Sequence, residues 1–168
     1  MNPGMRLVHR FGILVAVVVG TVVALVVPAG AKAAERPESC RLLRATEITQ
    51  AFAQPTAGGN PGHAPLLCDW SLGATDTRPA GAISVFLKRG DDATNDYSLA
   101  RGFHRDGQIT LRGLGRRAFY APDLETVYVL EDSGTIFFIQ GLFPEEGIDA
   151  TGLRSALVAL AGKASRRV

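Results

Sequence analysis

The stretch ETVYVLEDSGTIFFIQG, residues 125–141, holds two β-rich runs separated by a short polar connection. The runs 125–131 and 135–141 are dominated by β-branched and aromatic residues, which favour extended backbone. The connection Asp132-Ser133-Gly134 places a glycine in a three-residue loop, a pattern typical of a β-hairpin. The stretch therefore predicts two antiparallel strands.

The second run has apolar side chains on both faces, because Ile136-Phe137-Phe138-Ile139 are consecutive. Neighbouring side chains of a strand point to opposite faces, so both faces of this strand need a cover. We expect helices to cover a central strand here. An apolar ligand or a partner protein is the alternative cover.

Further strands are indicated before this hairpin. Period-two alternation, or enrichment in β-branched and aromatic residues, marks four more runs. These runs are 66–72, 82–88, 108–111 and 117–121. In contrast, residues 54–65 contain three prolines and three glycines, which predicts a long exposed loop without regular structure.

Apolar residues at helical spacing predict three helices. The first runs from about 46 to 53, with Thr46 as N-cap and Glu47 in its first turn. The second begins after Asp91 or Asp92 and ends near Phe103, and the third runs from about 149 to 165. On the buried side of the second helix we expect Tyr97 and Ala100, followed by either Phe103 or His104. On the buried side of the third helix we expect Leu153, Leu157 and Leu160.

The predicted order of elements is α-β-β-α-β-β-β-β-α. Short connections between strands favour an antiparallel sheet, and amphipathic helices need a sheet face to cover. We therefore expect an α+β fold, a single-domain two-layer sandwich in which helices cover one face of the sheet. The domain is expected to span residues 34–168, with its core at about 38–163.

The first 33 of the 168 residues have the pattern of a secretory signal peptide. Arg6 and Arg10 precede the uncharged apolar run 11–27, and small residues permit cleavage after Ala31 or Ala33. An uncleaved membrane anchor is the alternative, although 17 apolar residues are at the short limit for spanning a bilayer. We expect a secreted or cell-envelope protein that meets the membrane only transiently, through this segment.

Cys40 and Cys68 are the only two cysteines, and in an oxidising compartment they are expected to form one structural disulfide. A redox pair or a metal site is the alternative, but the spacing is not C-x-x-C and few histidines accompany them. The polar residues Pro37-Glu38-Ser39 before Cys40 do not fit a lipid-attachment site.

The charge of the predicted mature chain is close to zero. Without Arg6, Arg10 and Lys32, the 18 basic residues fall to 15, against 16 acidic ones. Such a chain has no global field that would attract nucleic acid, so we expect no nucleic-acid partner.

Arg112, Arg116 and Arg117 surround the sequence Gly113-Leu114-Gly115. Residues 113–118 fit G-x-G-x-x-A, but a dinucleotide site needs a helix after the glycines, and a β-rich run follows here. We expect a glycine turn with positive φ between two strands. The arginines are a weak candidate site for a phosphate, a lipid headgroup or an acidic wall polymer; solvated surface charges are the alternative.

No catalytic or metal-binding motif was found. The chain lacks a G-x-S-x-G elbow, an H-E-x-x-H helix, a P-loop and a calcium loop. His63 and His104 are the only histidines after the signal segment, too few for a zinc site without further ligands. We expect no metal, no cofactor and no enzymatic activity.

Several short motifs resemble the actinobacterial exported proteins grouped as domain of unknown function 3558. These motifs are Cys40-Arg41-Leu42-Leu43 with Glu47-Ile48, Cys68-Asp69-Trp70, and Gly113-Leu114-Gly115 with Ala118. The resemblance covers about residues 38–163 and implies one envelope-associated domain with a single disulfide and no known catalytic residues. Members are often lipoproteins, whereas this chain lacks the lipid-attachment motif.

The sequence therefore favours a non-catalytic binding or interaction module of the cell envelope. Its partner is expected to be an envelope protein, a wall polymer or a lipid. A carrier that holds an apolar small molecule or lipid between sheet and helices is the alternative, and a closed cavity would be its mark. A hydrolase with an unrecognised site is a third hypothesis.

Overall fold

The computed structural model of the protein describes residues 36–144 and 149–168, so the predicted signal peptide lies outside the described residues. The elements run in the order 3-10 helix η1 (Glu38–Arg41), α1 (Ala45–Phe52), β1 (Thr56–Pro61), β2 (Leu67–Leu72), β3 (Gly81–Arg89), α2 (Ala93–Phe103), β4 (Ile109–Leu111), β5 (Arg117–Ala121), 3-10 helix η2 (Pro122–Leu124), β6 (Thr126–Leu130), β7 (Thr135–Leu142) and α3 (Ala150–Ser165).

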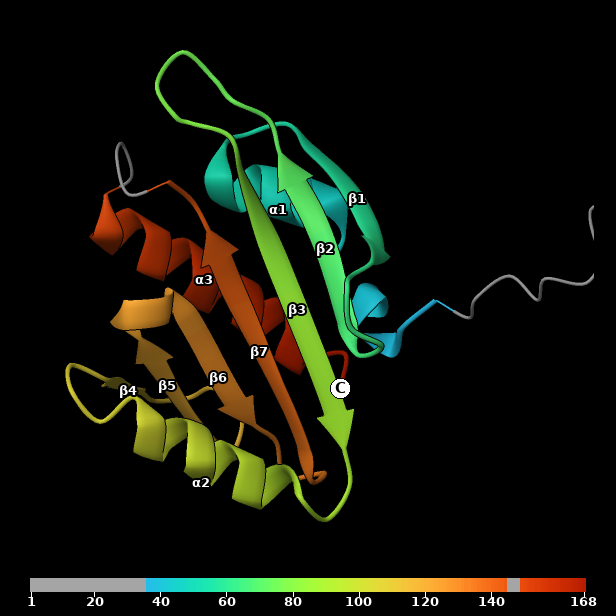
Figure 1. Cartoon of the computed structure of the whole chain (residues 1–168), viewed down its shortest axis with the longest axis vertical. Helices are drawn as coiled ribbons and strands as arrows, with labels where there is room; N and C mark the ends of the chain where they lie inside the picture. Colours follow the sequence, from blue (N-terminus) through green and yellow to red (C-terminus); the bar gives the residue numbers. More distant parts are fainter. Residues whose placement is uncertain (1–35, 145–148) are drawn as a thin grey trace, which may run out of the picture. The chain divides into compact units, whose positions relative to one another are not determined.

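The strands form one antiparallel sheet in the order β1-β2-β3-β7-β6-β5-β4 (Figure 1). The predicted hairpin of residues 125–141 is confirmed as β6 and β7, closed by Gly134 at a φ of 70°. β7 then pairs with β3 along eight residues of each strand. Because α2 lies between β3 and β4 in the chain, it must carry the chain from the centre of the sheet to its far edge.

Helices pack on both faces of the sheet. α1 and α3 cover one face and bury the large cluster that includes Trp70, Phe137 and Leu157. Figure 1 shows these two helices on the far side of β3 and β7. α2 packs on the opposite face, where Tyr97 and Phe119 belong to a second cluster. The predicted α+β class, antiparallel sheet and single domain are confirmed, but the helices are not confined to one face.

The central position predicted for the 136–139 run is also confirmed. Ile136 belongs to the cluster under α2, and Phe137 and Ile139 belong to the cluster under α1 and α3. All three are at most 3% exposed. Protein elements therefore cover both faces of this part of β7.

β1 is a strand where the sequence analysis predicted a loop, and that prediction is wrong. Residues 56–61 pair with β2, and the register shifts between Gly58 and Asn60. Gly58 and Gly59 have φ values of 106° and 81°, so they form a bulge at the edge of the sheet. The Arg36 side chain donates to the Gly59 carbonyl oxygen over 2.9 Å. An edge strand tolerates glycine and proline because one side of its backbone needs no ladder partner.

The start of α1 differs from prediction. Thr46 lies inside α1, and the Glu47 carboxylate accepts from the Arg44 backbone N–H over 2.9 Å, where a threonine cap was expected. Of the two alternatives at the end of α2, Phe103 is 82% exposed, whereas the His104 side chain is 12% exposed and lies on the buried side. Asp149 does cap α3, because its side chain accepts from the Thr151 and Gly152 backbone N–H groups.

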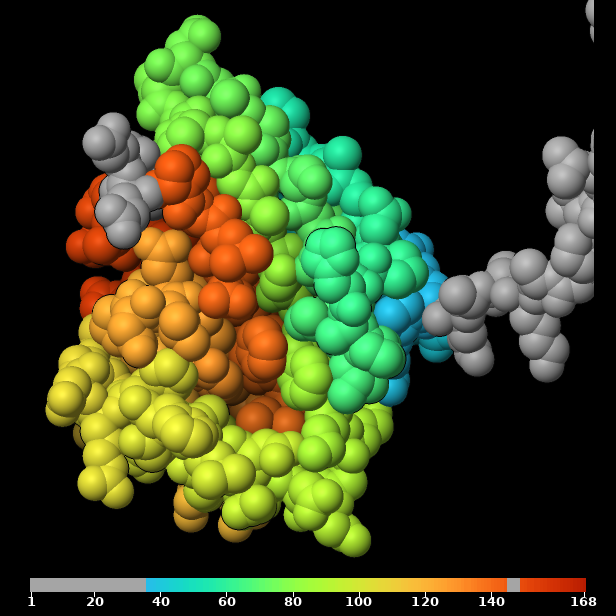
Figure 2. Space-filling view, viewed as in Figure 1, coloured from blue at the N-terminus to red at the C-terminus, as the bar shows by residue number. Residues whose placement is uncertain are grey.

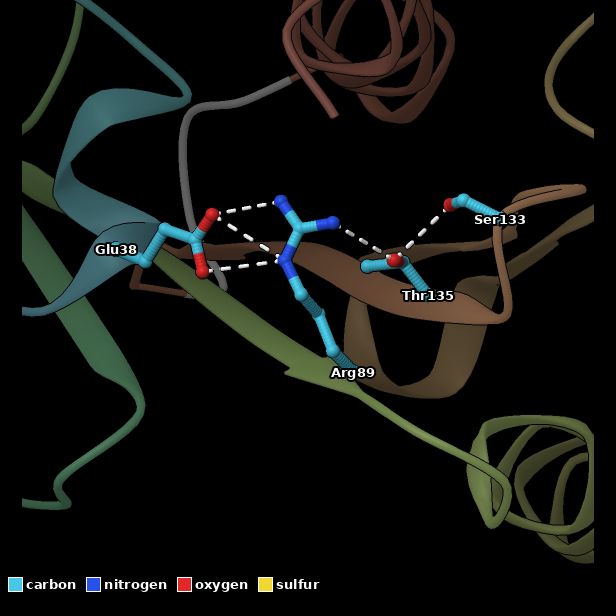
Figure 3. Close-up of polar contacts among 4 residues, drawn as sticks. All are labelled: Glu38, Arg89, Ser133 and Thr135. Carbon is cyan, nitrogen blue, oxygen red and sulfur yellow. Dashed lines mark hydrogen bonds and ion pairs between the residues drawn. The ribbon is translucent and has the colours of Figure 1, made fainter.

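The predicted disulfide joins Cys40 of η1 to Cys68 of β2. A polar cluster of Glu38, Arg89, Thr135 and Ser133 also holds η1 (Figure 3). The Arg89 guanidinium contacts the Glu38 carboxylate at 2.6 Å and donates to the Thr135 hydroxyl over 3.2 Å. The Ser133 hydroxyl in turn donates to Thr135 over 3.0 Å. η1 is therefore tied to β2, β3 and β7.

A second ion pair connects the C-terminus to α1. The Arg167 guanidinium donates to both Glu47 carboxylate oxygens, over 2.6 and 2.7 Å, and to the Leu42 carbonyl oxygen over 2.7 Å. The Glu47 and Arg167 side chains are only 15% and 28% exposed. The hydrogen bonds from Arg167 lower the pKa of the Glu47 carboxyl, and partial burial opposes this effect.

We expect Cys40→Ala and Cys68→Ala to lower the free energy of unfolding by similar amounts. The bond closes a loop with a sequence separation of 28, which corresponds to about 3.6 kcal/mol in the chain-entropy model. The double variant should be no less stable than the two single variants, since all three open the same loop. Denaturant unfolding without reductant measures these free energies. If the loss in the double variant equalled the sum of the two single losses, the prediction of one shared loop would be wrong.

We expect Glu47→Gln to cost about 1 to 2 kcal/mol at pH 7 and much less at acidic pH. The folded-state pKa of Glu47 is lowered, so its contribution is complete above the unfolded pKa of about 4.3 and is lost as the pH falls through the folded value. Urea unfolding at pH 7 and at about pH 3.5 measures the difference.

Glu38→Gln is the matched control for this comparison. Glu38 also has a lowered pKa, caused first by its hydrogen bond with Arg89, but its side chain is 51% exposed and that of Arg89 is 43% exposed. Exposed pairs contribute little, so a change of about 0 to 1 kcal/mol is expected. A larger loss of stability for Glu38→Gln than for Glu47→Gln would show that the contribution of these ion pairs does not follow their burial.

Candidate functional site: an arginine cleft

The turn between β4 and β5 has a fixed backbone. Gly113 and Gly115 have φ values of 74° and 53°, which confirms the predicted glycine turn. A Cβ atom at Gly115 would lie 2.8 Å from the Leu130 carbonyl oxygen, so this position has no room for a side chain. Leu114 is 8% exposed in the core, and the Arg116 backbone N–H donates to that same Leu130 oxygen over 2.8 Å. The turn is thus anchored to β6.

The structure brings the three predicted arginines together beside this turn. Arg112, Arg116 and Arg117 line one cavity of about 340 Å³, together with Thr110 of β4. Tyr97 and Arg101 of α2 form its opposite wall. The cavity therefore lies between α2 and the β4–β5 hairpin.

A second cavity of about 270 Å³ adjoins the first and shares Tyr97, Arg101 and Arg117 with it. Arg105 and Gln108, from the connection after α2, also line it. Figure 2 shows α2 and this connection, yellow-green to yellow, along the lower left of the face. We call the two cavities the arginine cleft; its arginines are Arg101, Arg105, Arg112, Arg116 and Arg117.

Arg101 and Arg105 were not predicted as site residues. Arg101 lies in the last turn of α2, and Arg105 follows in the connection between α2 and β4. Their closeness to each other was visible in the sequence. The sequence did not show that the end of α2 lies beside the β4–β5 turn, because that position depends on how the chain crosses the sheet between β3 and β4.

The arginines of the cleft have no carboxylate partner among the described residues. In contrast, Arg89 and Arg167 form ion pairs with Glu38 and Glu47. Arg101 makes only a 3.3 Å hydrogen bond to the Gln108 side chain. No aspartate or glutamate is among the residues that line the cleft. Five like charges near one another repel, and a bound anion would relieve that repulsion.

Tyr97 lies at the base of the cleft. Burial raises the pKa of its phenol, and the positive charges of Arg101 and Arg117 partly oppose this shift. The phenol therefore stays protonated at neutral pH and can donate a hydrogen bond. Guanidinium groups, a phenol and the Thr110 hydroxyl are able to donate to an anion, and none of them is a general base at neutral pH. The Ser98 hydroxyl instead donates to the Thr94 carbonyl oxygen over 2.8 Å.

The two histidines lie outside the cleft. His63 is exposed in the connection between β1 and β2. His104 contacts the Asp123 carboxylate at 2.7 Å and stacks on Tyr128, with ring centroids 5.8 Å apart, so it fastens the end of α2 to η2 and β6. The part of the chain that the structure describes contains no group of three or more His, Cys, Asp or Glu residues able to hold a metal ion.

A further cavity of about 360 Å³ lies between α1, α3 and the connection between β2 and β3. Its arginine, Arg78, donates to the Phe52 carbonyl oxygen. Gln54 in its wall is buried and donates to the Gly73 and Pro79 carbonyl oxygens. These hydrogen bonds hold the connection in place, and the buried Oε1 atom of Gln54 has no hydrogen-bond partner among the described residues.

No helix within residues 36–144 and 149–168 is both long and apolar enough to cross a membrane. Comparison with known proteins gave no similarity: no family model matches the chain, and no curated protein or solved structure matches it significantly.

Proposed function

We propose that this protein is an exported, non-catalytic binding module of the cell envelope, and that the arginine cleft binds its ligand. The ligand carries clustered negative charge of phosphate or carboxylate type. The observation that carries the proposal is the set of five arginines in adjoining cavities, none with a carboxylate partner among the described residues. Guanidinium groups form bidentate hydrogen bonds with such anions.

The composition of the cleft favours binding over catalysis and over the carrier alternative. The residues that line the cleft donate hydrogen bonds and carry positive charge, whereas acid–base catalysis at neutral pH needs a group that gives and takes a proton there. A carrier of an apolar molecule needs a mainly apolar cavity. Five arginines instead favour a polar, anionic ligand.

Export is proposed from the sequence and is supported by the disulfide. Residues 1–33 have the n-, h- and c-regions of a secretory signal, and Cys40 and Cys68 are bonded. Structural disulfides persist mainly in oxidising compartments. The resemblance to the actinobacterial exported family agrees with this location, and we place the protein in the envelope or the medium without a lipid anchor.

Expressed in an exporting host, the protein should be recovered from the envelope or medium with Lys32 or Ala34 as its first residue. Its denaturing mass without reductant should be two hydrogens below the reduced value, because of the disulfide. Ala31→Glu should block cleavage, since Ala31 is the last residue before one site and the third before the other. If the unaltered protein stayed inside the cell as the full-length chain, that result would contradict export.

Anion binding is tested with inorganic tripolyphosphate and isothermal titration calorimetry at low salt. We expect Arg101→Gln/Arg117→Gln to weaken binding about tenfold or more, because these residues line both cavities of the cleft. Binding of the unaltered protein should weaken as salt is added, because both partners are exposed to solvent.

The matched control is Arg41→Gln/Arg44→Gln, which removes the same charge from exposed positions on η1 and before α1. It should bind tripolyphosphate as the unaltered protein does. An equal loss in both double variants would mean that net charge alone attracts the anion and that the cleft is not a site.

A further inference from the structure

α2 exposes two large apolar side chains next to the arginine cleft. Phe103 is 82% exposed and Leu99 is 51% exposed. They lie four residues apart, so they are neighbours on one side of the helix, while Ala93 and Tyr97 form its buried side. Together with Asn95, Ser98 and Gly102 they line a shallow groove of about 310 Å³. We call Leu99 and Phe103 the apolar pair.

The groove of the apolar pair and the arginine cleft are continuous. Ser98 and Gly102 line both the groove and the second cavity of the cleft, beside Arg101 and Arg105. A surface that approaches the exposed side of α2 therefore meets two apolar side chains and, next to them, a cluster of guanidinium groups. Figure 2 shows that α2 is not covered by another element on the face in view.

Acidic residues do not neutralise this surface. Asp96 lies three residues before Leu99 and seven before Phe103, on the same side of α2 as the apolar pair, and its charge is paired with Lys88 at 2.7 Å. Asp106 follows Arg105 and is exposed. The Glu131 carboxylate lies beside Gly115 of the cleft and accepts from the Ser165 hydroxyl. Five arginines against Asp106 and Glu131 leave this surface with an excess of positive charge.

From these observations we propose that the protein docks on an anionic lipid bilayer through α2. This inference rests on the proposed function, because the arginine cleft supplies the contacts to lipid phosphates. The side chains of Leu99 and Phe103 insert among the lipids, and the arginines remain at the level of the headgroups. Exposed aromatic and aliphatic side chains beside basic residues are the arrangement by which proteins lie on an anionic membrane surface.

The small size of the apolar pair favours a bilayer over a protein partner. Specific protein interfaces use about 20 to 30 residues on each side, and two apolar side chains supply little of that. A bilayer needs no matching shape, and each inserted side chain and each neutralised headgroup adds to binding. The positive charge selects anionic lipids over zwitterionic ones.

The test uses two variants that each add one reporter tryptophan to the native Trp70, which is 2% exposed and therefore shielded from lipid. Phe103→Trp reports on the apolar pair. Leu66→Trp, at a position 43% exposed before β2, is the matched control. Each variant is mixed with vesicles of phosphatidylglycerol and phosphatidylcholine, or of phosphatidylcholine alone. All variants are purified from the exporting host as the processed chain that begins at Lys32 or Ala34, so the apolar run 11–27 does not contribute to vesicle binding.

We expect the fluorescence of Phe103→Trp to shift to shorter wavelength with the anionic vesicles only, and that of Leu66→Trp to stay unchanged. In sedimentation with the same vesicles, Leu99→Ser/Phe103→Ser should bind about tenfold more weakly and still bind tripolyphosphate. Arg101→Gln/Arg117→Gln should weaken the binding of both vesicles and tripolyphosphate about tenfold or more. These losses would show that insertion and charge act together.

Three results would overturn the inference. The first is intact tripolyphosphate binding without any shift of Phe103→Trp, which would leave the anion-binding cleft in place and remove membrane docking. The second is a concentration-dependent dimer in sedimentation that Leu99→Ser/Phe103→Ser abolishes, which would assign the apolar pair to a second copy of the chain. The third, the absence of both tripolyphosphate and vesicle binding, would remove the proposed function as well.

Discussion

The pairing of β3 with β7 is the interaction on which the rest of the structure depends. It joins the meander β1-β2-β3 to the meander β4-β5-β6-β7, and the sheet order places no other strand contact between the two. This order requires the chain to cross the sheet between β3 and β4, and α2 makes that crossing. The crossing brings the end of α2 beside the β4–β5 turn, and with it Arg101 and Arg105 beside Arg112, Arg116 and Arg117. The candidate site is thus a result of topology.

Sequence patterns predicted the elements of the fold better than their arrangement. β5 was predicted with its observed bounds, and the disulfide, the β6–β7 hairpin and α3 were found because strong local signals specify them. β1 was missed because glycine and proline are usually breakers, and only pairing with β2 makes them acceptable at an edge. For the site, Arg112, Arg116 and Arg117 were proposed from their closeness in sequence. Arg101 and Arg105 were missed because their proximity to the turn is a long-range property.

The arginines of this protein have two different roles in the fold. Arg89 and Arg167 hold η1 and the C-terminus in place through carboxylates, and Arg36 and Arg78 donate to backbone carbonyl groups. These side chains satisfy neighbouring acceptors and stabilise the segments they bridge. The arginines of the cleft are held near one another by a rigid turn and a helix end. A near-neutral chain can therefore carry a strongly positive region, which net charge alone does not reveal.

The two edges of the sheet limit its further growth. A strand of another chain could extend the sheet only by pairing with β1 or β4. β1 is bulged between Gly58 and Asn60, ends at Pro61, and has the Gly59 carbonyl oxygen occupied by Arg36. β4 has only three residues, too few for a long ladder. The two glycines and the proline of β1 thus protect a seven-stranded sheet against edge-to-edge aggregation while the chain folds.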